Sequence, residues 1–234
     1  MIDTSRGRII AIGDVHGCST ALTILLNAVQ PILVDTVIFL GDVIDYGPDT
    51  KGVLERITTL REAATVILLT GNHEEMLWGV LDGNIQLENW TRQGGDRTLE
   101  SYEIDHPSEL PMEHLTLLRL AQRFFETDTH LFVHANYYPN LPLAETPSAV
   151  LFWEFCDPAK CRPHYSGKTV VVGHTPQQSG ELLDLGYLVC LDTDVSRDGW
   201  LNALDAGSGA WWQADERGRS RQGQRRSVRK AVMT

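Results

Sequence analysis

Three short polar clusters in the first 74 residues contain the residue types from which proteins build metal sites. They are Gly13-Asp14-Val15-His16-Gly17, Gly41-Asp42-Val43-Ile44-Asp45 and Gly71-Asn72-His73-Glu74. Carboxylate, imidazole and amide groups can together bind a divalent metal. An imidazole that is paired with a carboxylate can also transfer a proton. We therefore interpret the three clusters as parts of one metal site whose residues come from separate segments of the chain.

Each cluster follows a short apolar run that is rich in β-branched residues, as expected of a buried strand. The runs cover residues 9–12, 37–40 and 66–69, and helical patterns begin near Ser19 and near Thr50 between them. This alternation predicts βαβ units and a mainly parallel sheet. Because parallel strands end at one edge of a sheet, we expect the three clusters to lie together.

Two later clusters also follow apolar runs. His134-Ala135-Asn136 follows residues 131–133, and Gly173-His174-Thr175 follows residues 169–172. A single histidine after a strand is more often structural than a metal ligand. Five clusters in the same kind of position instead indicate one shared site.

The remaining patterns place helices in the middle of the chain and strands after it. Residues 74–123 are helical in pattern, with a paired-glycine turn at 91–98 that contains Arg92 and Arg97. We interpret these arginines as solvated surface charge, although a guanidinium also suits phosphate. Strand-like runs at 131–134, 169–172 and 187–191 precede an expected hairpin over 201–212. Two packed sheets with helices outside would satisfy this order.

Composition restricts the class of protein. The 234 residues are 42% apolar and carry a net charge of −11, so we expect one domain and no specific binding to nucleic acid. There is no apolar run of membrane-spanning length and no signal-peptide pattern, which leads us to expect a cytoplasmic protein without membrane contact. The cysteines form no close pair, so free thiols are expected at Cys18, Cys156, Cys161 and Cys190.

The last twenty residues differ from the rest. Residues 215–234 contain seven basic and two acidic side chains and few apolar ones. Such a segment is predicted to be a disordered tail that could contact acidic partners, with residues 1–214 forming the catalytic domain.

The order Asp-x-His, Gly-Asp-x-x-Asp, Gly-Asn-His-Glu, His and Gly-His resembles that of the calcineurin-like metallophosphoesterases, in particular the phosphoprotein phosphatase branch and its bacterial relatives. The resemblance extends from Ile9 to Ala203, and a further stretch of the bacterial members is similar to Trp90, Gly94-Gly95, Thr98 and Ser101-Tyr102. It implies a four-layer α/β/β/α sandwich.

The resemblance also implies two divalent metal ions, of which manganese is the one we expect first and iron or zinc the alternatives. The ligands carried over are Asp14, His16 and Asp42 for one ion, and Asp42, Asn72, His134 and His174 for the other. Asp42 would bridge the two ions.

The same resemblance makes His73 the acid that protonates the leaving oxygen and Asp45 the carboxylate that orients it. Helix capping is the alternative for Asp45, and it is the role we expect for Glu74. Asn72 is also a candidate to contact the substrate.

Two departures concern substrate recognition. The family usually has a phosphate-binding arginine after the dyad aspartate, and Tyr46 stands there instead. A second arginine is not evident after Trp153, and Arg162 is the nearest downstream candidate. The hydrolytic residues are thus all present, while the residues that bind substrate differ.

These features favour a metal-dependent hydrolase of phosphoserine or phosphothreonine that uses a metal-activated hydroxide. An alternative is hydrolysis of diadenosine tetraphosphate or another nucleotide. A third reading is a scaffold that binds phosphoproteins without catalysis, but such a domain has no use for the proton donor His73.

Overall fold

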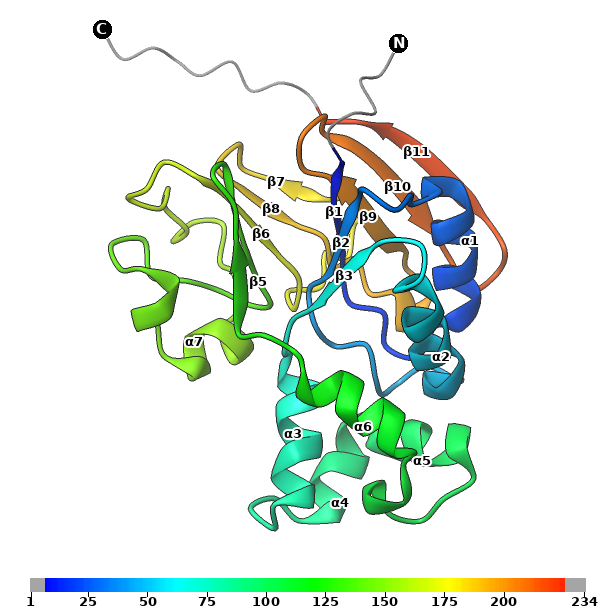
Figure 1. The fold of residues 1–234 in the computed structure, drawn as a ribbon. Coiled ribbons are helices and arrows are strands. Elements are labelled where there is room, and N and C mark those ends of the chain that lie inside the picture. The colour runs from blue at the N-terminus through cyan, green and yellow to red at the C-terminus, as the bar shows by residue number, and fades with distance from the viewer. Residues whose placement is uncertain (1–6, 226–234) are drawn as a thin grey trace, which may run out of the picture.

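The computed structural model describes residues 7–225, in which the strands form two sheets (Figure 1). The first sheet has the order β11-β10-β9-β1-β2-β3 and the second β4-β5-β6-β8-β7. The strands are β1 (Ile9–Ile12), β2 (Thr36–Phe39), β3 (Thr65–Leu68), β4 (Phe124–Glu126), β5 (His130–Val133), β6 (Thr169–Val172), β7 (Leu183–Asp184), β8 (Leu188–Cys190), β9 (Leu201–Asp205), β10 (Ala210–Ala214) and β11 (Ser220–Gln224).

The first three strands are parallel and in register, as their alternation with helices predicts. Ile10 lies opposite Val37, and Val37 lies opposite Val66. Helices α1 (Ser19–Val29) and α2 (Thr50–Leu60) make the crossovers. β9 then adds to β1 in the antiparallel sense, and the expected hairpin joins β9 to β10. The clusters that follow β1, β2 and β3 therefore lie at one edge of the sheet.

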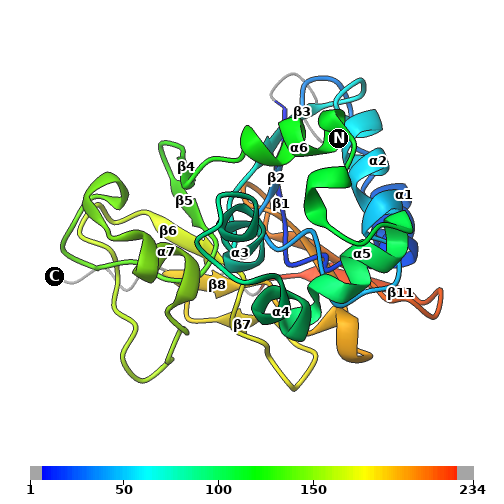
Figure 2. The same ribbon diagram turned by 90° about the horizontal axis from the view of Figure 1, so that it is seen from below.

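Alternate residues of the strands divide the core into layers. Ile10, Ile12 and Phe39 face α1 and α2, whereas Ala11 and Ile38 pack between the sheets with residues of the second sheet. The outer face of the second sheet is covered by α7 (Ser148–Trp153) and irregular segments. Figure 2 shows α7 on the opposite side from α1 and α2. The predicted α/β/β/α sandwich is confirmed, with an outer layer that contains little regular helix.

The helical middle of the chain gathers below the sheets in Figure 1, where β3 leads into α3. Its segments are α3 (Asn72–Leu81), α4 (Leu87–Trp90), a kinked turn (Thr91–Gly95) with Gly94 at φ 93°, α5 (Asp96–Tyr102) and α6 (Met112–Arg119). None of the helices described is long and apolar enough to cross a membrane.

The prediction of a disordered tail from residue 215 is wrong for residues 215–225. Residues 220–224 form β11, which pairs with β10 along five residues, so the folded domain does not end at 214. Arg225 binds the carboxylate of Asp184 through two hydrogen bonds of 2.8 Å, and the guanidinium of Arg221 lies over Trp200. Backbone pairing and an acidic partner replace the apolar burial that this strand lacks. Residues 226–234 lie outside the described part.

Candidate active site

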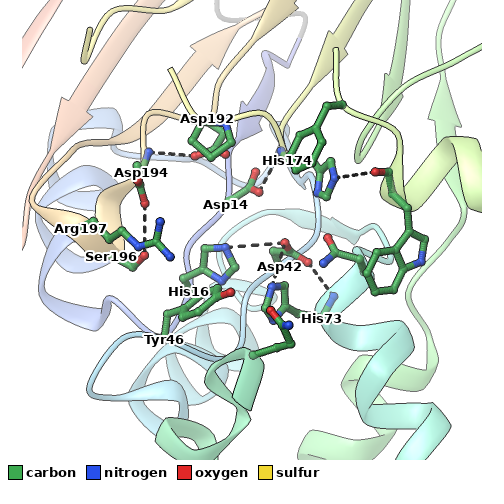
Figure 3. Close-up of a pocket in the computed structure, with 15 residues that line it drawn as sticks. Asp14, His16, Asp42, Tyr46, His73, His174, Asp192, Asp194, Ser196 and Arg197 are labelled. Carbon is green, nitrogen blue, oxygen red and sulfur yellow. Dashed lines mark hydrogen bonds and ion pairs between the residues drawn. The ribbon is translucent and has the colours of Figure 1, made fainter. Parts of the chain in front are cut away.

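Most of the predicted site residues line a pocket of about 360 Å³ at the ends of β1, β2, β6 and the start of α3 (Figure 3). Its wall includes Asp14, His16, Asp42, Asn72, His73 and His174. His134, which follows β5, is fully buried beside Asp42. The structure thus brings together all the residues that the sequence proposed as metal ligands.

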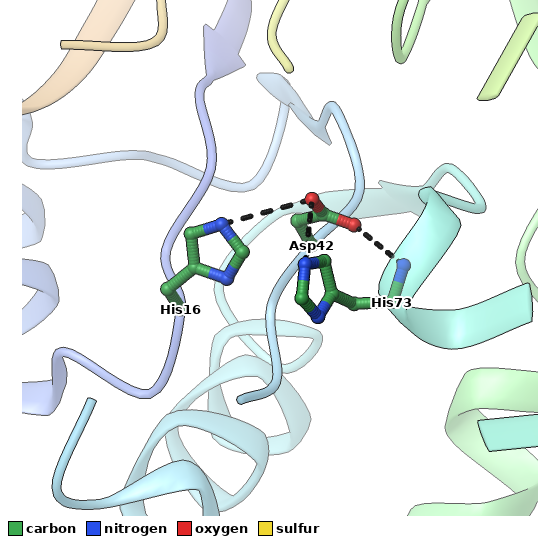
Figure 4. A group of neighbouring side chains, drawn as sticks. All are labelled: His16, Asp42 and His73. Carbon is green, nitrogen blue, oxygen red and sulfur yellow. Dashed lines mark hydrogen bonds and ion pairs between the residues drawn. The ribbon is translucent and has the colours of Figure 1, made fainter. Parts of the chain in front are cut away.

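Asp42 lies at the centre of the group. Its Oδ2 atom is 3.4 Å from Nε2 of His134, 3.7 Å from Nε2 of His16 and 4.0 Å from Nε2 of His73. Figure 4 shows His16 and His73 converging on this carboxylate. Donor atoms within 4.8 Å of one another form two sets: His16, Asp42 and His73, and Asp42, His134 and His174. Asp42 belongs to both sets, as a residue that bridges two ions must, and the first set contains the predicted proton donor His73 where the predicted ligands include Asp14.

The outer hydrogen bonds of the histidines fix which ring nitrogen faces the pocket. Nδ1 of His134 donates to the carbonyl of Leu40 at 2.9 Å, and Nδ1 of His16 donates to the carbonyl of Ile44 at 3.0 Å. This directs Nε2 of both rings toward Asp42, and Nε2 of His134 also lies 3.0 Å from Oδ1 of Asn72. Histidines that bind metals are usually held in this way.

One buried atom shows that the residues fit a cation. Oδ1 of Asp14 is buried and has no hydrogen-bond partner among the described residues. Burial and the nearby carboxylate of Asp192 raise the pKa of Asp14 well above its usual range. An unpartnered carboxylate oxygen beside a second buried acid is costly in an apolar environment unless a cation is present. Asp14 therefore has the surroundings expected of a metal ligand.

The charge states of the histidines agree with this fit. Burial lowers the pKa of His16 and of His174 to about 4, so both rings are neutral, the form that binds metals. Burial also acts on His134, but the charge of Asp42 opposes it and raises the pKa to about 10. A cation beside Asp42 would offset that charge and favour the neutral ring of His134.

The site is built from a strained backbone. His16, Asp42 and His174 have left-handed conformations with φ of 46°, 49° and 61°. Each such residue costs on the order of 1 kcal/mol or more and persists only where the surroundings fix it. Close packing helps to fix it here, because a Cβ atom on Gly71 would lie 2.1 Å from Oδ1 of Asp42, and one on Gly173 would lie 2.0 Å from Oδ1 of Asp14.

His73 and Asp45 form the predicted pair. Nδ1 of His73 donates to Oδ2 of Asp45 at 2.8 Å, and Nε2 faces the pocket. Trp90 and Thr98 also donate to this carboxylate, at 2.8 and 2.7 Å. Burial lowers the pKa of His73, but Asp42 and Asp45 reverse the effect and raise it to about 9. The ring is therefore set to hold a proton that it can donate into the pocket.

Glu74 has the structural place expected for it. Its carboxylate accepts hydrogen bonds from the backbone N–H groups of Gly71, Asp42 and Val43, at 2.8 to 2.9 Å. It caps the first turn of α3 and also joins that turn to the loop after β2. Glu74 thereby fixes the position of Asp42 relative to His73.

Tyr46 lines the pocket. Its ring centroid lies 5.0 Å from that of His16 and 4.9 Å from that of His73. The backbone N–H of Tyr46 donates to the carbonyl of Gly94 at 3.1 Å, and a Cβ atom on Gly94 would collide with the tyrosine ring. The paired-glycine turn therefore makes room for Tyr46.

The structure does not support Arg162 as a substrate-binding residue. Arg162 is exposed, does not line the pocket, and donates to the carbonyls of Ala159 and Cys161 in its own loop. Arg97 pairs with Glu100 on the surface, as we expected of it.

Sequence reasoning missed the segment that follows β8. Asp192, Asp194, Ser196 and Arg197 all line the pocket. The signal was present, because Asp192 follows a buried apolar strand just as Asp14 and Asp42 do. The exposed aromatic side chains of Trp153 and Phe155 were also missed as parts of the wall.

Comparisons with known proteins agree with this geometry. Residues 7–203 match the family model of the calcineurin-like phosphoesterases. A symmetrical bis(5'-nucleosyl)-tetraphosphatase from Nitrosomonas europaea is 33% identical over 131 residues, which cover 56% of this chain and 45% of the relative. The serine/threonine-protein phosphatase 1 of Salmonella typhimurium is 30% identical over 136 residues, which cover 54% of this chain and 57% of the relative.

Solved structures show the same fold at low identity. A cold-active protein-tyrosine phosphatase from a Shewanella species superposes with a TM-score of 0.68 at 18% identity, with 94% of this chain and 81% of that chain covered. Among the curated relatives, the match to the tetraphosphatases spans about half of their length.

Proposed function

The chain belongs to the calcineurin-like phosphoesterase family, and from this premise we propose that it hydrolyses dinucleoside polyphosphates. Members of this family are metal-dependent hydrolases of phosphoesters. The sequence alone ranked phosphoproteins first, but symmetrical bis(5'-nucleosyl)-tetraphosphatases among the relatives support the nucleotide alternative better.

Two exposed aromatic side chains in the pocket support a nucleotide substrate over a phosphoprotein. Trp153 and Phe155 line the pocket and are 41% and 64% exposed, and the ring of Phe155 stacks on His174 with a centroid distance of 4.7 Å. Flat aromatic surfaces at the mouth of a phosphate site can stack on a nucleobase. A phosphoserine side chain offers no ring for such stacking.

The residues of this chain divide the work of hydrolysis. Asp14, His16, Asp42, Asn72, His134 and His174 would hold two divalent ions. When bound, such ions supply a nucleophile near neutral pH and offset charge on the phosphoryl oxygens. His73 would give its Nε2 proton to the leaving oxygen, while Asp45 holds the ring through Nδ1.

Phosphoprotein hydrolysis remains the second candidate, because the Salmonella protein phosphatase is a relative of similar identity. The two readings differ in the leaving group. A nucleoside polyphosphate leaves readily without a proton, whereas the alkoxide of serine does not. His73 should therefore matter less for the nucleotide substrate than for a phosphopeptide.

A substrate panel tests the proposal. We expect the purified protein with Mn²⁺ to cleave diadenosine tetraphosphate with a kcat/KM at least about tenfold above that for phosphoserine and phosphothreonine peptides. Para-nitrophenyl phosphate serves as the control for general phosphatase activity. The reverse ranking, with para-nitrophenyl phosphate still cleaved, would return the assignment to the phosphoprotein class.

A further inference from the structure

Among residues 7–225, Arg197 provides the only Lys or Arg side chain in the wall of the metal pocket. It ends a short 3-10 helix (Val195–Arg197) in the segment after β8, far in sequence from the usual arginine position that Tyr46 occupies. Figure 3 shows its side chain extending toward Tyr46 and His16. The guanidinium carbon lies 5.7 Å from the centroid of the Tyr46 ring.

The guanidinium of Arg197 has no hydrogen bond or ion pair with any other described residue. The two acids nearest in sequence contact other residues. The carboxylate of Asp194 accepts a long hydrogen bond of 3.5 Å from the hydroxyl of Ser196, and Asp198 pairs with Arg217 at 2.6 Å. The backbone N–H of Arg197 donates to the carbonyl of Asp194 and fixes the turn. A cation held at a pocket in this way is available to an anionic ligand.

The charge of the pocket makes such a cation important. Asp14, Asp42, Asp192 and Asp194 all line it, and two divalent ions would balance four carboxylates without surplus. A substrate with several phosphates brings further negative charge into the pocket. Besides the ring of His73, Arg197 is the side chain of the described wall whose charge attracts it.

The position of Arg197 indicates which phosphate it contacts. His16 and His73 lie beside Asp42. Tyr46 packs against these two histidines, and Arg197 lies beside Tyr46. Trp153 and Phe155 line another part of the wall, where a base can stack. A phosphate at Asp42 would therefore leave Arg197 to a neighbouring phosphate of the same chain.

We propose that Arg197 binds a phosphate adjacent to the one that is attacked, so that the pocket selects substrates with a chain of phosphates. This inference rests on the proposed function, because it names how that site recognises a polyphosphate. In this proposal Arg197 does not bind the phosphate that is attacked, which is the role of the usual family arginine.

Inhibition measurements test Arg197 whether or not a nucleotide is the substrate. Hydrolysis of para-nitrophenyl phosphate is to be followed at saturating free Mn²⁺, and inhibition constants are to be measured for orthophosphate and inorganic tripolyphosphate. In Arg197→Gln the preference for tripolyphosphate over orthophosphate should fall about 10- to 100-fold, the worth of a charge-assisted hydrogen bond. Arg197→Lys should retain part of the preference, because lysine keeps the positive charge but lacks the paired N–H donors of the guanidinium.

Arg61→Gln is the matched control, since Arg61 is an exposed arginine at the C-terminal end of α2 and does not line the metal pocket. It should leave the preference unchanged. An equal loss of affinity for both anions in Arg197→Gln would place the arginine on the reacting phosphate and overturn the proposal, as would no change for either. If diadenosine tetraphosphate is not cleaved while the tripolyphosphate preference depends on Arg197, the proposed substrate fails and the subsite stands.

Discussion

Asp42 is the residue whose carboxylate belongs to both sets of metal-binding atoms. We expect Asp42→Asn to abolish activity and to lower the bound metal to one ion or none per chain, because a neutral amide bridges two cations poorly. Metal analysis by mass spectrometry after gel filtration measures this directly. Two tightly bound ions together with normal turnover in the variant would refute the bridging role.

His73 differs from Asp42 in that its role depends on the substrate. His73→Ala should lower kcat by about 10²- to 10⁴-fold for phosphopeptides, the usual worth of a positioned acid. The loss should be smaller for para-nitrophenyl phosphate and for diadenosine tetraphosphate, whose leaving groups need less protonation. Steady-state kinetics with the three substrates provides the comparison, and an equal loss for all of them would remove His73 from the acid role.

Among the secondary-structure elements, β11 makes a contribution that can be isolated. Truncation after Glu216 removes the β10–β11 ladder and the pair between Arg225 and Asp184. We expect this to lower Tm by about 5 °C or more in calorimetry, since about 1 kcal/mol shifts Tm by roughly 2 to 4 °C at this chain length. Truncation after Arg225 is the control. A melting curve like that of the full chain would mean that β11 adds nothing to stability.

The elements differ in how far the sequence could predict them. β1, β2 and β3 were predictable because each leaves a clear apolar run rich in β-branched residues, which in β1 and β2 is buried on both faces. β11 was not, since its Ser-Arg-Gln-Gly-Gln sequence contains no apolar residue and pairs only through its backbone and polar side chains. The ligands followed predictable strands, whereas Arg197 enters the pocket from a loop whose course depends on tertiary packing. The prediction that Arg162 binds substrate was wrong for the same reason, because the sequence does not show where its loop lies.

At the scale of the whole molecule, the acidic site should couple metal binding to stability. Removal of metal by a chelator should lower Tm, because the buried carboxylates Asp14, Asp42 and Asp192 would then repel one another. At free metal about 100 times Kd, binding adds about 2.7 kcal/mol, or roughly 5 to 10 °C at this size. Thermal denaturation with and without Mn²⁺ measures the shift. A Tm that changes with neither Mn²⁺ nor Mg²⁺ would show that no ion binds the folded state.

The order of the first sheet has a consequence for how the chain reaches its native state. β1 lies between β2 and β9, so Ile10 pairs with Asp205, and the N–H of Ala21 in α1 donates to the carboxylate of Glu216. Contacts between such distant positions close late, because the entropy of a long loop must be overcome first. During synthesis, the clusters around Asp14 and Asp42 leave the ribosome long before β9 does. The first half of the site must therefore remain partly unpaired until β9 and the strands after it have been synthesised.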